Sequence, residues 1–285
     1  MEEVNINNIS QDKNGSLTYD FNEEVGFIMT VVTSIIICIG LPLTLVAIYA
    51  IRSLVKNDHV APVYVINLLI SDLIQLCCMI VWVAQPEGSK IYKIIFIIYY
   101  SGLVASVCFM LCIALERYLV IACPLWYRFR RTIKVSLVVC VVVWALPLIC
   151  VITLVFWDFV EVADTICAIF FLLPFPLFIF FLGGTLKALS ASISVHADEK
   201  RRIVGMLVLV LLIYMLLFLP SIIWLLAERD RYNNTSKDLS SVFLRLSPLA
   251  DLILYVFMRK GTTDKLLASV CCCRMDSDDI SSSTV

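Results

Sequence analysis

The sequence predicts an all-α membrane protein: a seven-transmembrane helix bundle followed by a short amphipathic eighth helix. Hydrophobic residues make up 61% of the chain, and the mean hydropathy is +0.96. Uncharged runs long enough to cross a bilayer, which takes roughly 20 residues, recur along the chain. A soluble domain of this length does not have so apolar a composition.

Five of the predicted spans contain no charged residue. They are residues 25–51, 94–115, 135–157, 165–186 and 203–227. Two more spans, 62–83 and 239–257, place charges in the membrane, Asp72 in the first and Arg245 and Asp251 in the second. Intramembrane charges are costly and mark functional positions. We therefore divide the chain into an extracellular segment (1–24), a membrane domain (25–257) and an amphipathic helix with a cytoplasmic tail (258–285).

The distribution of basic residues predicts the orientation. Of the 22 lysines and arginines, fifteen lie on the same side as the carboxyl-terminal tail, six lie on the opposite side, and Arg245 lies within the membrane. Because basic loops stay in the cytoplasm, we expect a multi-pass plasma-membrane protein with an extracellular amino terminus. Glycosylation sequons at Asn8, Asn14, Asn233 and Asn234 fall on the predicted outer side.

The third span carries one stripe of residues at helical spacing. Its members are Tyr99, Leu103, Ser106, Met110, Ile113 and Arg117. Ordinary helix packing explains the apolar members equally well. Ser106 and Arg117 are different because polar groups in hydrocarbon need partners. We expect Asp72 to be the partner of Ser106.

Short motifs are spread over nearly every span in a fixed order. They are Gly40-Leu41-Pro42, Asn67 to Asp72, Glu116-Arg117-Tyr118, Trp144, Phe218-Leu219-Pro220 and Asp251 to Tyr255. On these motifs the chain resembles the rhodopsin-like (class A) G protein-coupled receptors. The first and last of them are similar to the branch of nucleotide, protease-activated, lysolipid, proton-sensing and hydroxy-acid receptors. The loop from Cys123 to Arg131 resembles that of Mas-related receptors.

The resemblance implies that residues 25–257 are a receptor domain that activates a heterotrimeric G protein. Arg117 would be held by Glu116 and by Glu199, and activation would break these contacts as the sixth helix swings about Pro220. The implied coupling and switch residues are Glu116, Arg117, Tyr118, Glu199, Phe218, Pro220 and Tyr255.

The resemblance also implies a structural sodium ion, which is the only cofactor that we expect. Asp72 and Asp251 would bind it, with Ser106 and Ser247 as further oxygen ligands, and hard cations prefer oxygen. The alternative is a pair of carboxyl groups that share a proton without metal.

Several positions depart from the family pattern. Tyr92 stands where a cysteine is usual, so Cys167 lacks its customary disulfide partner. Phe218 replaces a tryptophan, Leu252 replaces a proline and Thr44 replaces an asparagine. These changes leave open a constitutively active or weakly coupled receptor without a diffusible agonist.

The ligand hypothesis depends on Arg245, a guanidinium inside the seventh span. It would bind a ligand anion or an internal acid such as Asp72, or it would extend to the outer interface. Trp82, Tyr99, Tyr100 and Leu103 would supply an apolar aromatic wall. The predicted ligand is therefore a small acidic or lipid-like molecule.

The tail predicts further partners. A basic amphipathic stretch, 259–270, precedes Cys271, Cys272 and Cys273, which we expect to be palmitoylated at the membrane surface. Ser277 and residues 281–284 are candidate targets of receptor kinases, and phosphates there would recruit arrestin. The final Ser283-Thr284-Val285 fits a PDZ domain.

A different class of protein also places acids and an arginine inside seven helices, namely an ion or proton transporter. The sequence has no inverted halves, which argues against transport. It also has no nucleophile with a base and oxyanion donors, so we expect no enzymatic activity. We expect no nucleic-acid partner.

Overall fold

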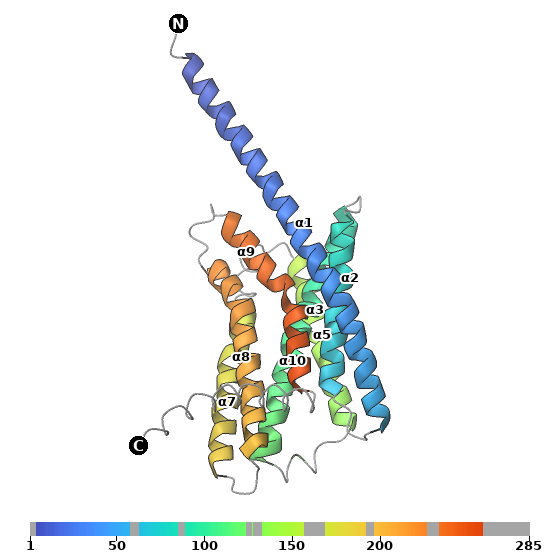
Figure 1. Ribbon diagram of the computed structural model, residues 1–285. Coiled ribbons are helices and arrows are strands. Elements are labelled where there is room, and N and C mark those ends of the chain that lie inside the picture. The colour runs from blue at the N-terminus through green and yellow to red at the C-terminus, as the bar shows by residue number, and fades with distance from the viewer. Residues whose placement is uncertain are drawn as a thin grey trace, which may run out of the picture.

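The computed structural model consists of long helices that run side by side (Figure 1). It describes the backbone of residues 4–57, 63–84, 89–123, 127, 133–156, 169–191, 197–226 and 234–258, and the side chains of residues 25–51, 63–84, 90–123, 127, 134–153, 155, 169–190, 200–224 and 239–257. The helices are α1 (Val4–Asn57), α2 (Val63–Val83), α3 (Ser89–Ala122), α5 (Ile133–Phe156), α7 (Pro174–Ala191), α8 (Ala197–Leu226), α9 (Asn234–Arg245) and α10 (Ser247–Met258).

Seven stretches of the described residues are long and apolar enough to cross a membrane. They are Val25–Ile51, Val63–Val83, Lys90–Ala122, Lys134–Thr153, Ile169–Ser190, Lys200–Trp224 and Leu239–Phe257. The predicted seven-helix fold is therefore confirmed. The third helix is longer than its uncharged run, because it continues through Glu116, Arg117 and Tyr118 to Ala122.

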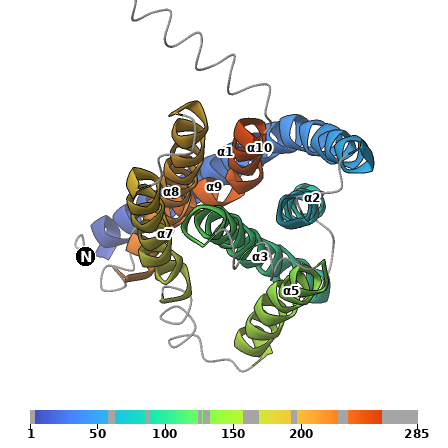
Figure 2. The ribbon, with the colours of Figure 1, turned by 90° about the horizontal axis from the view of Figure 1, so that it is seen from below.

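Helix α3 lies in the middle of the bundle. It packs against α2, α5, α7 and α8, and the view along the bundle shows these helices around it (Figure 2). Helix α1 lies at the edge, against α2, α9 and α10, and its first half projects beyond the other helices (Figure 1). We call the end where α2 ends and α3 begins the outer end, and the end where α3 ends and α5 begins the inner end.

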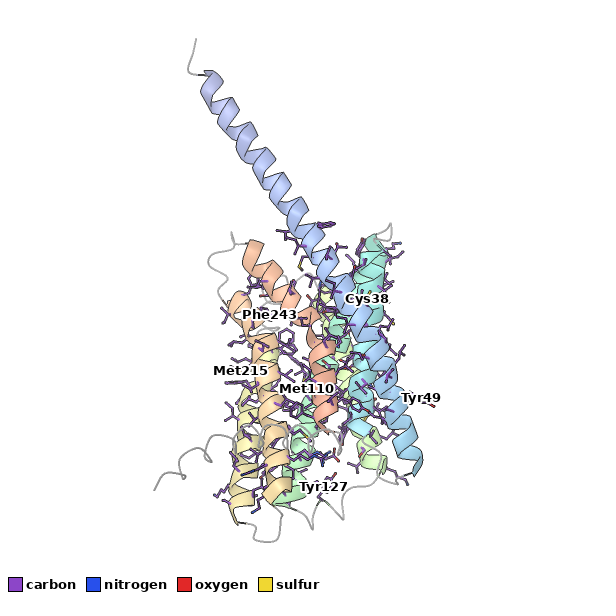
Figure 3. The ribbon with its side chains drawn as sticks, viewed as in Figure 1. Cys38, Tyr49, Met110, Tyr127, Met215 and Phe243 are labelled. Carbon is purple, nitrogen blue, oxygen red and sulfur yellow. The ribbon has the colours of Figure 1, made fainter. Side chains whose placement is uncertain are left out.

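Apolar side chains fill the interior and also cover the outside. Phe109, Met110 and Ile113 of α3 are buried, whereas Tyr49 of α1 is 77% exposed. Figure 3 shows Met110 between the helices and Tyr49 pointing away from them. An outward-facing apolar surface of this kind suits a hydrocarbon environment, because lipid tails make its exposure favourable.

The seventh span is broken into α9 and α10 at Leu246. Pro248, the second residue of α10, has no N–H to continue the helical hydrogen-bond pattern. Just before it, the Leu246 N–H is shared between the carbonyls of Val242 and Phe243, each at 3.1 Å, as is common where a helix ends. The break places Arg245 at the end of one helix and Ser247 at the start of the next.

Helices α2 and α5 are joined by a side-chain hydrogen bond. Trp144 donates from Nε1 to Oδ1 of Asn67 at 3.0 Å, and Asn67 donates from Nδ2 to the Val63 carbonyl at 2.9 Å. Because each polar atom of this pair has a partner inside the apolar bundle, the contact fixes α5 against the rest of the fold.

Candidate functional site

Arg245 is fixed at the outer half of the bundle by two other helices. Its Nη1 donates a hydrogen bond to Oγ1 of Thr33 in α1, a side chain that is buried. Its Cζ lies 5.6 Å from the centre of the Trp82 ring in α2, within the range of a cation–π interaction. The predicted internal partner, Asp72, was wrong, since neither of its oxygens takes a hydrogen bond from Arg245. The bond to Thr33 also holds the guanidinium inside the bundle instead of at the outer interface.

A group of aromatic rings lies beside this arginine. The Trp82 and Tyr99 rings lie 4.7 Å apart, and the Tyr99 and Tyr100 rings lie 5.3 Å apart, edge to face. These rings belong to a small apolar cluster on α1, α2 and α3. Leu103, by contrast, is buried in the larger core that α7 and α8 share. Tyr100 packs against both clusters, so Leu103 lies in the core that adjoins the other four residues. The role of all five in ligand binding stays a prediction.

Gln75 is a polar residue of this region that the sequence analysis missed. It is fully buried in α2, and neither its amide oxygen nor its amide nitrogen has a hydrogen-bond partner in the described part of the chain. The Tyr99 hydroxyl is also buried without such a partner. The signal in the sequence was an amide inside an otherwise apolar run, which requires a partner in hydrocarbon.

A pair of carboxyl groups lies deeper in the bundle. Asp72 of α2 and Asp251 of α10 are both fully buried, and their side chains are close enough to share a hydrogen bond. No N–H or hydroxyl of the described residues donates to either group. The expected contact between Asp72 and Ser106 is absent, because Ser106 donates to the Leu103 carbonyl of its own helix at 2.8 Å. A serine in a helix readily makes this local bond.

The two carboxyl groups and a nearby hydroxyl could together hold a cation. The Ser247 hydroxyl, at the start of α10, is buried without a hydrogen-bond partner among the described residues. The carboxyl oxygens together with this hydroxyl form the hard oxygen donor set that sodium prefers. No cluster of three His, Cys, Asp or Glu side chains occurs in the described regions, so a site for a transition metal is not indicated there.

Arg117 lies near the inner end of α3 and is half-buried. Its Nε is buried and has no hydrogen-bond acceptor among the described residues. The neighbouring Glu116 accepts a hydrogen bond at 2.6 Å from the hydroxyl of Tyr127, which lies at this end of the bundle (Figure 3). The structure thus gives Glu116 a partner other than the predicted Arg117. The side chain of Glu199, the second predicted acid, lies outside the described residues.

Tyr118 packs directly on a glycine of α7. Its ring lies 5.9 Å from that of Phe180 and 5.8 Å from that of Phe181. A Cβ atom added to Gly184 would lie 2.6 Å from Cε2 of Tyr118, whereas one added to Gly183 would meet nothing within 4 Å. Only glycine at position 184 allows α3 and α7 to approach with this tyrosine between them.

Phe218 lies in the outer half of α8 and belongs to an aromatic stack. Its ring is stacked on that of Tyr214 at 4.9 Å and lies 5.4 Å from that of Phe171. The Tyr214 hydroxyl donates to the Phe171 carbonyl. Two residues later Pro220 lies inside α8, and Ser240 of α9 donates to its carbonyl at 3.2 Å. The predicted pivot of the sixth span is therefore tied to the seventh span. Tyr255 is half-buried and packs against the larger core.

Several predicted modification sites cannot be placed. Cys167, Asn233 and residues 259–285 lie outside the described residues, and with them the amphipathic helix, the palmitoylation sites Cys271 to Cys273 and the phosphorylation and PDZ motifs. Asn8, Asn14 and Asn234 lie in α1 and α9, but their side chains are not described. These assignments stay predictions.

Comparison with known proteins establishes the family. Residues 43–255 match the family model described as 7 transmembrane receptor (rhodopsin family). The chain belongs to this family. It is a multi-pass membrane protein of a class whose members are receptors and not enzymes, and the resemblance drawn from its motifs is confirmed.

Individual relatives are distant. The chain is 24% identical over 265 residues to G-protein coupled receptor 68 of Mus musculus, covering 80% of this chain and 72% of that protein. It is 31% identical over 176 residues to Mas-related G-protein coupled receptor member A4 of Mus musculus, covering 55% of each. It is 34% identical over 120 residues to the type-1 angiotensin II receptor of Meriones unguiculatus, covering 40% of this chain and 33% of that protein. The matched part of the last two relatives is about half and about a third of their length.

Proposed function

We propose that this rhodopsin-family receptor activates a heterotrimeric G protein when a small acidic or lipid-like ligand binds near its outer end. The observation that carries the proposal is the position of Arg117. Its guanidinium lies near the inner end of the central helix, where a cytoplasmic protein can reach it, and Glu116 is bound to Tyr127. A charged group in such a place is expected to serve a partner.

Outward movement of α8 would open the inner end to that partner. Pro220 interrupts the hydrogen-bond pattern of α8 and lies two residues outward of Phe218, whose ring is stacked on Tyr214. At the inner end, Lys200 of α8 donates to the Leu189 carbonyl of α7 at 3.0 Å. A ligand that favours the open state shifts the population toward it by its difference in affinity for the two states.

Guanine-nucleotide exchange tests this proposal. Membranes carrying the full chain are supplied with purified G protein, and exchange is measured with and without acidic lipids and short carboxylic acids. Arg117→Ala should abolish exchange while surface expression is retained. Lys134→Ala, which removes an exposed basic residue at the start of α5, is the control and should leave exchange unchanged. Normal exchange by Arg117→Ala would contradict the proposal.

The ligand part of the proposal has its own test. Arg245→Gln removes the charge but keeps a donor for Thr33, so the response to anions should disappear. Exchange that proceeds in wild-type membranes regardless of any anion would favour a receptor that is active without an agonist. Ion flux through vesicles without nucleotide exchange would favour a transporter.

The buried acids are proposed to hold a sodium ion. Asp72, Asp251 and Ser247 would supply oxygen ligands, and Ser106 would supply a further one through the lone pairs that its donated bond to Leu103 leaves available. The ion would supply positive charge between two acids that accept no hydrogen bond from an N–H or hydroxyl of the described residues.

The remaining proposals concern the protein's surroundings. We place it in the plasma membrane with its amino terminus outside, glycosylated at the predicted asparagines and palmitoylated at the tail. Receptor kinases, arrestin and a PDZ protein are proposed partners of the tail. An epitope at the amino terminus should be labelled on intact cells, and labelling only after permeabilisation would reverse the orientation.

A further inference from the structure

The Gln75 amide is buried without a hydrogen-bond partner among the described residues. Gln75, Asp72 and Met79 are buried on one face of α2, and Gln75 is fully covered. Its Cγ is packed against α3, since a Cβ on Gly102 would come within 3.3 Å of it. An amide that is buried without a hydrogen-bond partner lowers stability, so its presence between two helices calls for an explanation.

Two other polar groups lie just outward of Gln75. Tyr99 precedes Gly102 by three residues on α3, a rise of about 4.5 Å toward the outer end. Its buried hydroxyl has no hydrogen-bond partner within the described part, and its ring packs on Trp82. Arg245 lies over the same Trp82 ring and acts electrostatically on Tyr99. From the outer end inward, the order is therefore guanidinium, phenol and amide.

These groups lie on one side of the bundle. Trp82 and Tyr99 belong to the cluster formed with α1, whose buried members do not include residues of α7 or α8, whereas Tyr100 also packs against the larger core. Thr33 of α1 accepts one of the five N–H donors of Arg245. The guanidinium, the Tyr99 hydroxyl and the Gln75 amide thus lie on α9, α3 and α2, linked by the Trp82 ring and by the contact of Gln75 with Gly102.

We propose that Arg245, Tyr99 and Gln75 form a single ligand site for a monocarboxylate. The ligand would carry an amide or hydroxyl group, separated from its carboxylate by about the length of one helical turn. This inference rests on the proposed function, whose ligand class it narrows. A single guanidinium balances a single negative charge, and its N–H groups match the geometry of a carboxylate. The glutamine amide both donates and accepts, so its complement is a group that does the same.

The Gln75 contact would determine specificity. A site built to hydrogen-bond a ligand group rejects the analogue that lacks it, because the polar group of the protein is then left unpaired. An acid with a purely apolar chain would still reach Arg245 and Tyr99, but it would form no hydrogen bond with the Gln75 amide. Tyr99 and Gln75 are closed off from solvent, so entry of the ligand requires the surrounding side chains to shift.

A matched pair of probes tests the inference. Glutaric acid monoamide and 5-methylhexanoic acid have the same shape, but the first ends in a carboxamide and the second in an isopropyl group. Binding is measured as the rise in the thermal unfolding midpoint of the purified full-length receptor, which requires no G protein. The amide acid should stabilise the wild type at a concentration about tenfold lower than its apolar match.

Three variants complete the design. Gln75→Met keeps the unbranched side chain that packs on Gly102. It should abolish the preference for the amide acid, so that both acids stabilise the variant at about the same concentration. Gln75→Leu should do the same. Both should unfold at or above the wild-type temperature without ligand, because they remove an unpartnered amide. Arg245→Gln should lose the stabilisation by both acids.

The outcomes separate this inference from the proposed function. Equal stabilisation by the two acids, stabilisation by neither, a preference that survives in Gln75→Met, or lower unliganded stability of both Gln75 variants would overturn the inference. If the acids bind with the expected preference but nucleotide exchange does not respond, the proposed function fails and the site stands. If exchange responds to anions through Arg245 without any dependence on Gln75, the proposed function stands and the site fails.

Discussion

Arg245 and Arg117 are both half-buried, yet their surroundings differ. Arg245 donates to Thr33 and lies over the Trp82 ring, so three helices fix it. Arg117 has a buried Nε without an acceptor in the described part, and its neighbour Glu116 is bound to Tyr127. The outer arginine therefore contributes to the stability of the fold, whereas the inner arginine would, under the proposed function, serve a cytoplasmic partner.

The largest expected effect is on the stability of the outer end. Arg245→Met removes a charged hydrogen bond and a cation–π contact, which together should lower the free energy of unfolding by about 2–4 kcal/mol. Arg117→Met should leave it unchanged or raise it, because a buried donor without a partner is removed. The thermal unfolding midpoints of the two purified variants provide the measurement.

Thr33→Val is the control for this pair. It removes the acceptor of Arg245 and leaves Trp82 in place, so it should account for roughly half of the loss, about 1–2 kcal/mol. If Arg245→Met and Arg117→Met change the midpoint equally, the difference between the two arginines is not energetic.

The next effect concerns the helix that carries the inner arginine. Gly184→Ala forces its Cβ into the Tyr118 ring and should cost about 1–3 kcal/mol of unfolding free energy. Gly183→Ala is the matched control, since its Cβ meets nothing within 4 Å, and it should be neutral or slightly stabilising. The thermal unfolding midpoints of the two variants provide the measurement.

Relief by a second change would locate the clash. Gly184→Ala combined with Tyr118→Ala should lose less stability than the sum of the two single variants, because the added methyl group then has room. Simple additivity would mean that the Tyr118 contact is not the reason for a glycine at position 184.

A smaller effect is expected between the two arginines, at the carboxyl pair. Sodium chloride should raise the unfolding free energy of the wild type relative to choline chloride at equal ionic strength, by about 1.4 kcal/mol at ten times the dissociation constant. Asp251→Asn should respond equally to both salts. An equal response of the wild type would leave the acids as a proton-sharing pair.

The membrane-spanning helices were predictable from the sequence, because composition determines them. The seven spans follow from uncharged runs. Helical spacing left the direction of Arg245 open, and the structure places Trp82 beside it. The hydrogen-bond partners of buried polar side chains were harder to predict, because a polar side chain in a helix can also bond the backbone of its own helix. Ser106 bonds the Leu103 carbonyl and not Asp72, and Arg245 contacts a threonine from a span more than 200 residues away.

Gln75 and Gly184 show the same limit in another form. The importance of each depends on which residue of another helix lies opposite. Gly102 lies opposite Gln75, and Tyr118 lies opposite Gly184. The rotation of one helix against its neighbour decides this, and hydrophobic periodicity does not define that rotation to within one side chain.

The central claim is that Tyr127 holds Glu116 and so leaves Arg117 available to a cytoplasmic partner. Tyr127→Phe keeps the ring and removes the hydroxyl that donates to Glu116, so Glu116 can then pair with Arg117. Tyr127→Phe combined with Glu116→Gln should restore the wild-type behaviour, because a neutral side chain does not form that ion pair.

Guanine-nucleotide exchange in membranes carrying Tyr127→Phe is the most direct test. A hydrogen bond to a charged group is worth about 1.5–3 kcal/mol, so exchange should fall by about tenfold or more and recover in the double variant. Exchange by Tyr127→Phe at or above the wild-type rate would contradict the account.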